Sequence, residues 1–491
     1  MSARLDVLLS HGYVLAEDEH ERQVMMPYAP LGLLYVSAWL KRRGLRVEVH
    51  DSTFSTLPEL ERRIDEQRPL VLGLYGNLVT RATLLRLIAA GRAAGCYVVL
   101  GGPEPAPHAE EYLRRGAHVV VEGEGELTLE ELVAHLRERG LDGVERVAGT
   151  VTLGPDGRLR RGPAREQIAP LDRLPWPDRE AIDVPRYLQT WRQHRGFGSL
   201  SLITARGCPY TCTWCSHAVF GLTHRRRSVA DVADEVAHLV ERWAPDRLWY
   251  ADDVFTIHTG WLLDYAAELR RRGLRVPFEC ISRADRLDER VADALAGMGC
   301  RRVWIGAESG SQRILDAMKR RTTAEDVRRK TALLQARGLQ VGMFIMLGYE
   351  GEDECDLRAT AEHLKAASPD VFLTTVSYPI KGTEYHDSLG ARVESDLPWE
   401  QRTDRQLRVA GRPSRRFYTH ATRWLVNDVA LHRLRREGGG GLPRLLRHWA
   451  AAQYGRLGMR LTRGEREAAG SPGGRGWDAH EGAARRAAGA R

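Results

Sequence analysis

The 491-residue sequence predicts an α/β protein with two parallel-sheet domains and a helical C-terminal extension. Three observations support this prediction. Strand-like runs alternate with amphipathic helix patterns over residues 1–142, a second alternation covers residues 200–388, and the alternation fades from residue 389. Continuous Val/Leu runs are typical of parallel strands covered on both faces. The first domain is therefore expected to be a doubly wound, Rossmann-like sheet.

The first domain contains five strand-like runs with helix patterns between them. The runs lie at residues 5–10, 45–51, 70–76, 97–103 and 118–124, and the clearest helix patterns at 31–44, 80–95 and 128–140. Ligands of such sheets bind beyond the carboxyl ends of the strands. Glycine-rich segments fall at that edge: "YGN" (75–77), "GGPE" (101–104) and "EGEGE" (122–126). Glycine lets the backbone approach a large flat ligand closely.

Residues 143–199 are rich in Pro, Gly and Arg and predict a linker with a short hairpin around Gly154–Gly157. Six strand–helix units follow, with strands expected at residues 199–207, 247–253, 276–283, 301–309, 339–347 and 370–379. Six units rather than eight favour an open, partial (β/α)6 barrel, with its chemistry at the carboxyl ends of the strands.

The C-terminal region, residues 389–462, contains two Arg-rich amphipathic helix patterns at 415–438 and 442–461. We expect these helices to cap the active site. The last segment, 463–491, is rich in Gly, Ala and Arg and poor in bulky apolar residues, so it is expected to be disordered.

The composition excludes several classes of protein. The formal charge is +8, but only five of the 73 basic residues are Lys, which indicates a coding bias toward Arg rather than a nucleic-acid partner. No apolar run approaches the roughly 18–20 residues that span a bilayer, and the N-terminus lacks the pattern of a signal peptide. We therefore expect a cytoplasmic protein with neither a membrane nor a nucleic acid as partner.

Three of the seven cysteines, Cys208, Cys212 and Cys215, lie together in "RGCPYTCTWCSH" at the exit of a predicted strand. A structural zinc site needs four ligands, usually in two pairs. A disulfide would leave one thiol over, in a compartment that disfavours disulfides. A [4Fe–4S] cluster normally takes four thiolates, so three would leave one iron open for a substrate or cofactor. The pattern favours the cluster, with zinc as the remaining alternative.

The segment "CPYTCTWC" resembles the signature of the radical S-adenosylmethionine (SAM) enzymes, Cys-x3-Cys-x-aromatic-Cys, with Trp214 in the aromatic place. The resemblance implies that the three cysteines are catalytic ligands of a [4Fe–4S] cluster. It also implies that the open iron chelates SAM, and that an electron from the cluster then yields a 5′-deoxyadenosyl radical, which abstracts hydrogen from the substrate.

The same resemblance implies SAM contacts at the successive strand ends. Arg283 would bind the SAM carboxylate and Glu308 the ribose hydroxyls. Each acidic or Arg residue, taken alone, could equally well belong to a surface ion pair or cap a helix. Their occurrence at successive strand ends favours a SAM-binding site. The implied SAM-binding set is Trp214, Tyr250, Asp252, Asp253, Ser282, Arg283, Glu308 and Leu347.

The first domain resembles the cobalamin-binding domain of B12-dependent radical SAM enzymes, on residues 27–51, 74–80, 98–113 and 119–132. It lacks the Asp-x-His-x-x-Gly motif whose His ligates cobalt in many such domains. The resemblance then implies base-off, His-off cobalamin with Asn77, Leu78 and Val79 at its lower face. The other implied contacts are Gly101, Gly102, Pro103, Glu104, Glu122, Gly123 and Glu124.

Together these resemblances imply a methyltransferase. It would move a methyl group from SAM through methylcobalamin to an unactivated carbon, or phosphorus, of a small-molecule natural-product intermediate, with flavodoxin or ferredoxin as reductant. An oxidative cyclase or rearrangement enzyme on the same scaffold is the alternative, and a sensor of SAM or B12 a more distant one. Methylthio transfer to tRNA is disfavoured, because residues 1–140 contain only Cys96.

Overall fold

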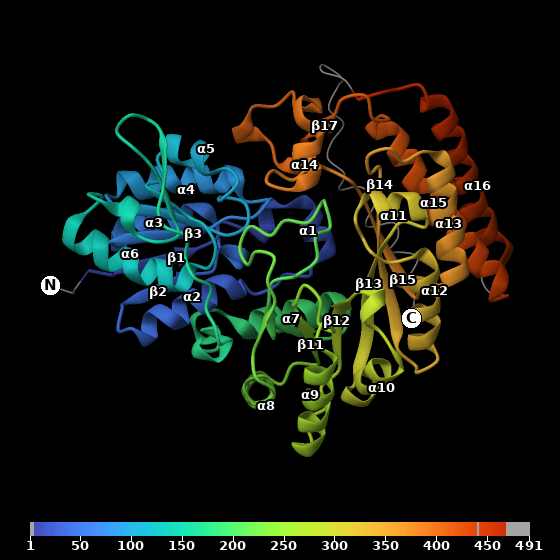
Figure 1. Cartoon of the computed structure of the whole chain (residues 1–491), viewed down its shortest axis with the longest axis horizontal. Helices are drawn as coiled ribbons and strands as arrows, with labels where there is room; N and C mark the ends of the chain where they lie inside the picture. The colour runs from blue at the N-terminus through green and yellow to red at the C-terminus, as the bar shows by residue number, and fades with distance from the viewer. Residues whose placement is uncertain (1–3, 439–440, 468–491) are drawn as a thin grey trace. The chain divides into compact units, whose positions relative to one another are not determined.

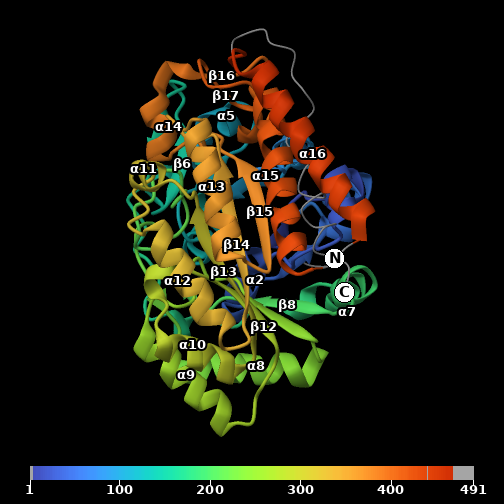
Figure 2. The ribbon, with the colours of Figure 1, turned by 90° about the vertical axis from the view of Figure 1, so that its right-hand side faces the viewer.

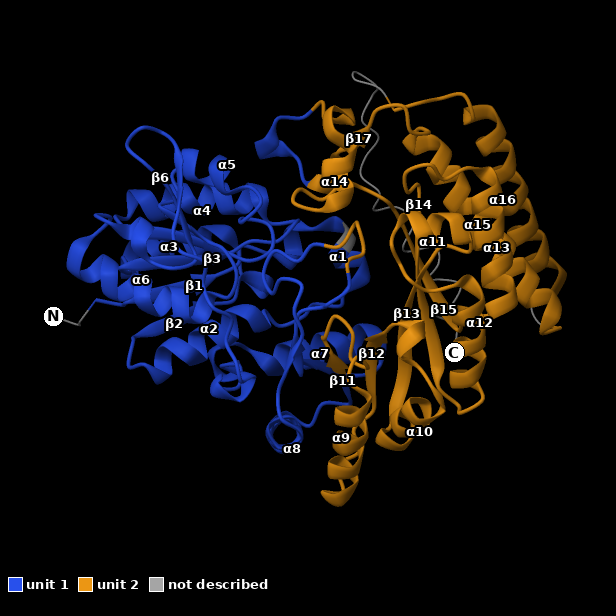
Figure 3. Cartoon of the chain, in the orientation of Figure 1, with its two compact units in different colours: residues 1–210, 216–248, 397–403 blue, residues 211–215, 249–396, 404–491 orange. Residues whose placement is uncertain are grey.

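The structure, a computed structural model, describes residues 4–438 and 441–467 (Figure 1). The chain forms two compact units (Figure 3). Unit 1 comprises residues 1–210, 216–248 and 397–403; unit 2 comprises residues 211–215, 249–396 and 404–491. The segment expected to be disordered lies outside the described residues from 468 onward.

The first sheet belongs to unit 1 and has the strand order β2-β1-β3-β4-β5-β6-β7. Strands β1 to β5 pair in parallel, as a doubly wound sheet requires, and this confirms the predicted fold. The bounds are β1 Val7–Ser10, β2 Val47–His50, β3 Val71–Tyr75, β4 Tyr97–Gly101, β5 Val119–Val121, β6 Thr150–Leu153 and β7 Leu159–Arg161.

Helices cover both faces of this sheet because successive side chains of a strand point to opposite faces. In β1, Val7 and Leu9 pack in one core cluster with helices α2 and α6, while Leu8 packs in the other with α3, α4 and α5 (Figure 1). The bounds are α2 Leu31–Arg42, α3 Leu57–Gln67, α4 Arg81–Ala93, α5 Ala109–Arg114 and α6 Gly125–Arg139, preceded by α1 Glu19–Val24.

The predicted linker is more structured than its composition indicates. The expected hairpin is present as β6 and β7, which pair antiparallel and extend the first sheet beyond β5. A helix that the sequence reading did not identify, α7 (Val184–Arg195), follows. The Asp183 carboxylate caps it by accepting a hydrogen bond from Arg186 N at 3.0 Å.

The second sheet has six strands in the order β15-β14-β13-β12-β11-β8, which matches the six predicted strands. Strands β12 to β15 pair in parallel, in consecutive order along the chain. The strands are β8 Ser199–Leu202, β11 Arg247–Tyr250, β12 Phe278–Ser282, β13 Cys300–Glu308, β14 Gln340–Leu347 and β15 Val371–Val376. The helices along this part of the chain are α8 Val229–Trp243, α9 Thr259–Arg271, α10 Glu289–Met298, α11 Gln312–Ala317, α12 Ala324–Gln335 and α13 Glu354–Ala367.

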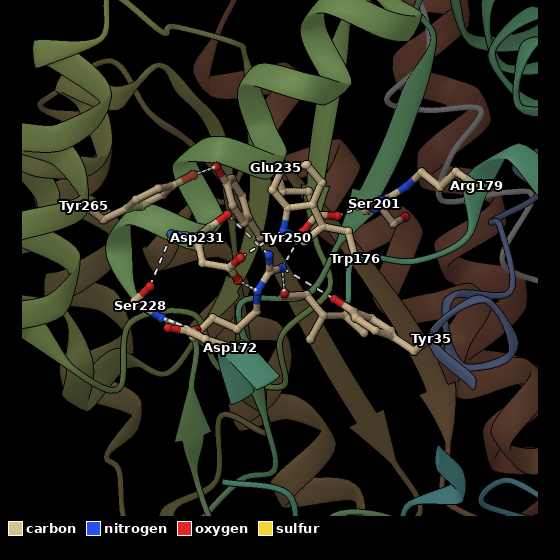
Figure 4. A network of polar contacts seen from close by, with 12 residues as sticks. Tyr35, Asp172, Trp176, Arg179, Ser201, Ser228, Asp231, Glu235, Tyr250 and Tyr265 are labelled. Carbon is tan, nitrogen blue, oxygen red and sulfur yellow. Dashed lines mark hydrogen bonds and ion pairs between the residues drawn. The ribbon is translucent and has the colours of Figure 1, made fainter. Parts of the chain in front are cut away.

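Unit 1 includes helix α8, which follows residue 199 in the chain. Buried charged groups join this helix to residues 176–179. Glu235 of α8 accepts hydrogen bonds from Arg179, at 2.6 Å, and from Arg227 (Figure 4). Asp231 accepts from Arg227 and from Trp176 Nε1. Burial alone would raise the pKa of Glu235, but the two guanidinium groups hold it below its ordinary value. The domain boundaries expected at residues 142 and 199 stay predictions.

The C-terminal helices lie where the sequence predicts them. Helix α15 (Arg415–Arg436) packs against α13 and against α16 (Gly441–Thr462) in unit 2 (Figure 2). The short elements α14 Glu384–Leu389, β16 Val393–Glu394 and β17 Arg408–Val409 precede them. After α16 the chain returns, and Glu467 forms a buried ion pair with Arg412. No helix of the described residues is long and apolar enough to cross a membrane.

Candidate active site

The cluster motif begins at the end of a short strand in unit 1. Strand β9 (Ala205–Arg206) pairs antiparallel with β10 (Arg225–Arg226), and Gly207 follows with φ +87°. A Cβ at Gly207 would lie 2.2 Å from the carbonyl oxygen of Thr223, so only glycine fits there. The half-buried Cys208 comes next. Cys208 therefore follows directly on a turn position, residue 207, that has no room for a side chain.

Arg206 connects this turn to the carboxyl end of β5. Its Nη1 donates to Glu124 Oε1 at 2.6 Å and its Nη2 to Glu126 Oε1 at 2.5 Å. The three side chains are at most 5% exposed. Arg225 also donates to Glu124, at 2.8 Å. Burial would raise the pKa of Glu124, but Arg206 and Arg225 keep it below its ordinary value. The sequence alone assigns no role to Arg206 or Glu126.

The other two cysteines belong to unit 2. Cys215 N donates to Cys212 O at 3.1 Å and closes a turn between them. Thr213 bonds the hydroxyl of Tyr349 at 2.6 Å, and its backbone bonds Met318 and Tyr385. The Trp214 ring packs against an apolar cluster that includes Ile314, Met318, Met346, Tyr349 and Tyr385. The aromatic residue of the motif therefore anchors the turn that carries both thiols.

Two guanidinium groups are directed at Cys212. Arg283 Nη1 lies 3.8 Å and Arg320 Nη1 3.7 Å from its Sγ. Cationic donors stabilise a thiolate, the form that binds iron, so the residues present fit a cluster ligand. The seven cysteines, all within the described residues, form no disulfide. No three or more His, Cys, Asp or Glu side chains of the described chain are placed to hold a single metal ion.

Arg320 was not predicted, because nothing in the segment "MKRRTT" distinguishes it from its neighbours. Its Nη2 donates to Gly306 O in β13 at 2.8 Å, and a Cβ at Gly306 would lie 2.4 Å from that nitrogen. Its Nε lies 3.9 Å from Glu308 Oε1. Glu308 ends β13 with φ +60°. Burial raises the pKa of its carboxyl above the ordinary value, against the opposing charges of Arg320 and Arg283.

The remaining expected SAM residues lie at or just beyond the carboxyl ends of β11, β12 and β14. Ser282 and Arg283 are buried; the Ser282 hydroxyl bonds Thr256 at 2.6 Å, and Arg283 donates to Asp285 at 2.8 Å. Tyr250 is a core side chain whose hydroxyl bonds Tyr265 at 2.7 Å. Asp252 and Leu347 are buried and Asp253 is exposed. Their roles toward SAM stay predictions.

The expected cobalamin residues follow β3, β4 and β5, neighbouring parallel strands of unit 1. Asn77 Oδ1 accepts from Val79 N at 3.1 Å, so residues 77–79 form a closed turn that leaves Leu78 partly exposed and Val79 40% exposed. Gly102 has φ +104°, and a Cβ there would lie 2.5 Å from the carbonyl oxygen of Gly76. Gly101, Pro103, Glu122 and Gly123 are half-buried beside them. An apolar turn beside glycine-rich strand ends fits a flat macrocycle.

Glu104 and Glu124 lie at this edge, but both carboxylates are engaged within the protein. Glu104 accepts from Arg81 Nε at 2.7 Å and from the Tyr112 hydroxyl. Burial raises the pKa of Glu104, although Arg81 opposes this effect. Arg81 also donates to the carbonyl oxygens of Trp399, at 3.3 Å, and Arg402, at 2.7 Å. Glu104 therefore supports the docking of residues 397–403; a ligand contact through either carboxylate stays a prediction.

Histidines near this edge have engaged ring nitrogens. His11 Nε2 lies 2.9 Å from Asp51 Oδ1, and its Nδ1 accepts from Tyr13 N at 3.1 Å. His50 Nε2 lies 3.0 Å from Ser55 Oγ. His108 contacts Arg81 through Nε2 and accepts from Trp399 through Nδ1. These contacts fit cobalamin without a protein histidine below the metal. Sequence reasoning did not identify the pair of His11 with Asp51.

Two family models match the chain. The model described as the radical SAM superfamily matches residues 202–364, and the model described as the B12 binding domain matches residues 23–133. Both matches fall on the regions that carry the candidate cluster and the glycine-rich sheet edge.

Curated relatives match most of the chain. An uncharacterized methyltransferase of Pyrococcus horikoshii is 28% identical over 72% of this chain and 77% of its own. The anaerobic magnesium-protoporphyrin IX monomethyl ester cyclase of Rubrivivax gelatinosus is 26% identical over 75% and 67%. The cytidylyl-2-hydroxyethylphosphonate methyltransferase of Streptomyces wedmorensis is 25% identical over 72% and 76%.

Solved structures share the fold. The radical SAM methyltransferase TsrM from Kitasatospora setae, with cobalamin and a [4Fe–4S] cluster bound, matches with a TM-score of 0.68 and 20% identity over 81% of each chain. The cobalamin-dependent SAM radical enzyme OxsB, with aqua-cobalamin bound, matches with a TM-score of 0.70 and 17% identity over 94% of this chain and 72% of its own.

Proposed function

Because this chain belongs to the radical SAM enzymes that carry an amino-terminal B12-binding domain, we propose that it is a methyltransferase. It moves a methyl group from SAM through cobalamin to an unactivated carbon, or phosphorus, of a small-molecule intermediate. Its cofactors are a [4Fe–4S] cluster, SAM and cobalamin. Flavodoxin or ferredoxin is the proposed electron donor.

The observation that carries the proposal is the buried contact of Arg206 with Glu124 and Glu126. Arg206 stands two residues before the first cluster cysteine, and both carboxylates follow β5 at the edge proposed for cobalamin. One buried group of charges thus joins the turn before Cys208 to the sheet edge proposed for cobalamin, and both of these segments belong to unit 1. Such coupling suits a reaction that uses both cofactors, because a displacement of one ångström can cost about 100-fold in rate.

When bound, the cluster with SAM supplies hydrogen abstraction and the corrinoid supplies a transferable methyl group. The protein's own residues bind and orient these groups. Cys208, Cys212 and Cys215 hold the cluster, and Arg283 and Arg320 donate to the Cys212 sulfur. Glu308 would accept hydrogen bonds from the SAM ribose, and the turn of Asn77, Leu78 and Val79 would exclude water from the bound corrinoid. The helices of residues 389–462 cover the substrate.

The relatives support methyl transfer and also indicate the main alternative. Two of the three relatives above are named methyltransferases, and the third is a cyclase. An oxidative cyclisation on the same scaffold would use the cluster and SAM without moving a methyl group. The two reactions therefore differ in whether label from the SAM methyl group reaches cobalamin.

The test uses the full chain, purified anaerobically with hydroxocobalamin and reconstituted with iron and sulfide. The holoenzyme is reduced and incubated with methyl-labelled SAM, and both labelled methylcobalamin and 5′-deoxyadenosine are measured by chromatography. Label in cobalamin, together with 5′-deoxyadenosine, is the expected result. 5′-Deoxyadenosine without labelled cobalamin would contradict methyl transfer and support the cyclase alternative. Absence of both products from a fully loaded protein would support a sensor instead.

A further inference from the structure

The outer face of α16 is apolar although it faces solvent. Leu442, Leu446, Trp449, Leu457 and Leu461 recur at intervals of three, four or eight residues, which places them on one side of a helix. Together with the neighbouring Tyr454 they form what we call the α16 stripe, and these six side chains are 48% to 75% exposed. Exposed bulky apolar side chains gathered on one helix face are typical of an interaction site.

The opposite face of α16 is fixed to the protein. A Cβ at Gly455 would lie 2.6 Å from the backbone nitrogen of Trp424, and one at Gly458 would lie 2.2 Å from His420 Nδ1. These glycines let α16 lie directly against α15, and α16 lies beside α15 in Figures 1 and 2. The α16 stripe is therefore held outward by a tightly packed inner face rather than presented by a loose helix.

The charge along α16 is of one sign. Residues 441–462 contain four arginines and no acidic residue. Arg456 forms an ion pair with Asp428 at 3.1 Å. The other three, Arg444, Arg447 and Arg460, form no ion pair with the rest of the described chain. The helix therefore combines exposed Leu and Trp side chains with uncompensated positive charge.

We propose that the α16 stripe docks the protein on the surface of an anionic lipid bilayer. Leu, Trp and Tyr on one face with flanking arginines are the composition of helices that lie in the headgroup region. The long aliphatic part of an arginine side chain also lets its guanidinium group reach lipid phosphates from a helix that lies among the headgroups. This proposal does not depend on the proposed reaction. It departs from the expectation of no membrane partner, which rested on the lack of a spanning segment.

Other occupants fit the charges or the shape less well. A second copy would bring the unpaired arginines of two α16 helices together without an acidic partner. The segment 468–491 has Trp477 as its one bulky apolar residue and carries more Arg than acidic residues. An acidic protein would have to supply a groove for an exposed apolar helix face, whereas a bilayer surface accommodates such a face without one.

The test is flotation of the anaerobically purified holoenzyme with vesicles of phosphatidylglycerol and phosphatidylcholine. Vesicles of phosphatidylcholine alone are the neutral control. We expect binding to the anionic vesicles that weakens as salt is added. Replacing the three unpaired arginines together (Arg444→Gln, Arg447→Gln, Arg460→Gln) should weaken binding about 100-fold. Leu446→Glu with Leu457→Glu should weaken it at least about tenfold.

The matched control is Leu141→Glu, which changes an exposed leucine of unit 1 and should bind as the wild type does. Circular dichroism and iron content establish that each variant is folded and loaded. If the leucine variant fails to fold, the arginine variant alone decides, because its side chains lie in solvent. Absence of vesicle binding at low salt, or binding unchanged by the arginine substitutions, would overturn the proposal. So would a dimer of the wild type that Leu446→Glu with Leu457→Glu converts to a monomer.

Discussion

Arg206, two residues before the first cluster cysteine, forms a buried charged hydrogen bond with Glu126, with Nη2 and Oε1 2.5 Å apart. Arg206→Met would leave the carboxylates of Glu124 and Glu126 buried without this partner. Because an uncompensated buried charge is costly, we expect the free energy of unfolding to fall by about 3–5 kcal/mol. Urea unfolding of the apoprotein measures this loss.

Arg192→Met is the control for that substitution. Arg192 pairs with Asp246 in the same unit at 2.7 Å, but both side chains are 46% exposed. An exposed pair contributes only about 0–1 kcal/mol. Equal losses in the free energy of unfolding for the two variants would show that the Arg206 ion pairs contribute no more to stability than an exposed ion pair does.

The three motif cysteines are expected to be individually required for the cluster. Replacing Cys208, Cys212 or Cys215 by Ala removes one of only three thiolate ligands. Iron and sulfide contents after anaerobic reconstitution should then fall to near background. Cys355→Ala, which removes an exposed thiol of α13, should retain the wild-type iron content. Equal iron in a motif variant and in the wild type would exclude the cluster assignment for that cysteine.

Arg320→Gln should change the cluster without removing it. The substitution keeps all three cysteines but takes a positive charge and a hydrogen bond from the Cys212 sulfur. The reduced cluster is then less well stabilised, so its midpoint potential should become more negative. Affinity for iron should fall about 10–100-fold. Electron paramagnetic resonance during an anaerobic redox titration measures the potential.

The neighbouring Arg321 supplies the comparison. It is exposed, and its contact with the Thr211 hydroxyl is long, at 3.4 Å. Arg321→Gln should leave the potential at its wild-type value. An identical potential in Arg320→Gln and the wild type would refute the role assigned to Arg320.

Glu352 is expected to make the stability of the fold depend on pH. Burial raises the pKa of its carboxyl to about 8, with Asp356 and Asp353 adding to the effect and the Gly348 N–H opposing it. The ordinary pKa of a glutamate carboxyl is 4.5. Between pH 4.5 and about pH 8, the folded state therefore keeps a proton on Glu352 that the unfolded chain releases. The free energy of unfolding therefore decreases as pH rises through this window and levels off above it.

Glu352→Gln removes the titrating group while keeping its size. We expect this variant to resemble the wild type near pH 4.5 and to be more stable than it at pH 8. Thermal unfolding of the apoproteins across the window measures both slopes. Glu362→Gln, at an exposed position of α13, should keep the wild-type slope. A Glu352→Gln variant with the wild-type slope would contradict the burial argument.

Much of the fold follows from local patterns. The strands of both sheets lie within a few residues of the predicted runs, because buried parallel strands read as continuous apolar segments bounded by glycine and polar residues. Helix α7 was missed because Pro185 and three arginines obscure its apolar face, although Asp183 before it and Gly196 after it are ordinary end signals. The pairing of β6 with β5 was missed because no pattern within either strand indicates which distant strand it pairs with.

By itself, the sequence determined the cysteine spacing, the two sheet domains and the two C-terminal helices, since each depends on residues close together in the chain. Only the tertiary structure decided which charges meet. It joined Arg206 to Glu126, 80 residues away, and Arg320 to Cys212, 108 residues away. It also left the bulky apolar residues of α16 exposed, because the glycines on the opposite face of that helix pack directly against α15. The free energy of such contacts depends on burial, which residue type and spacing do not encode.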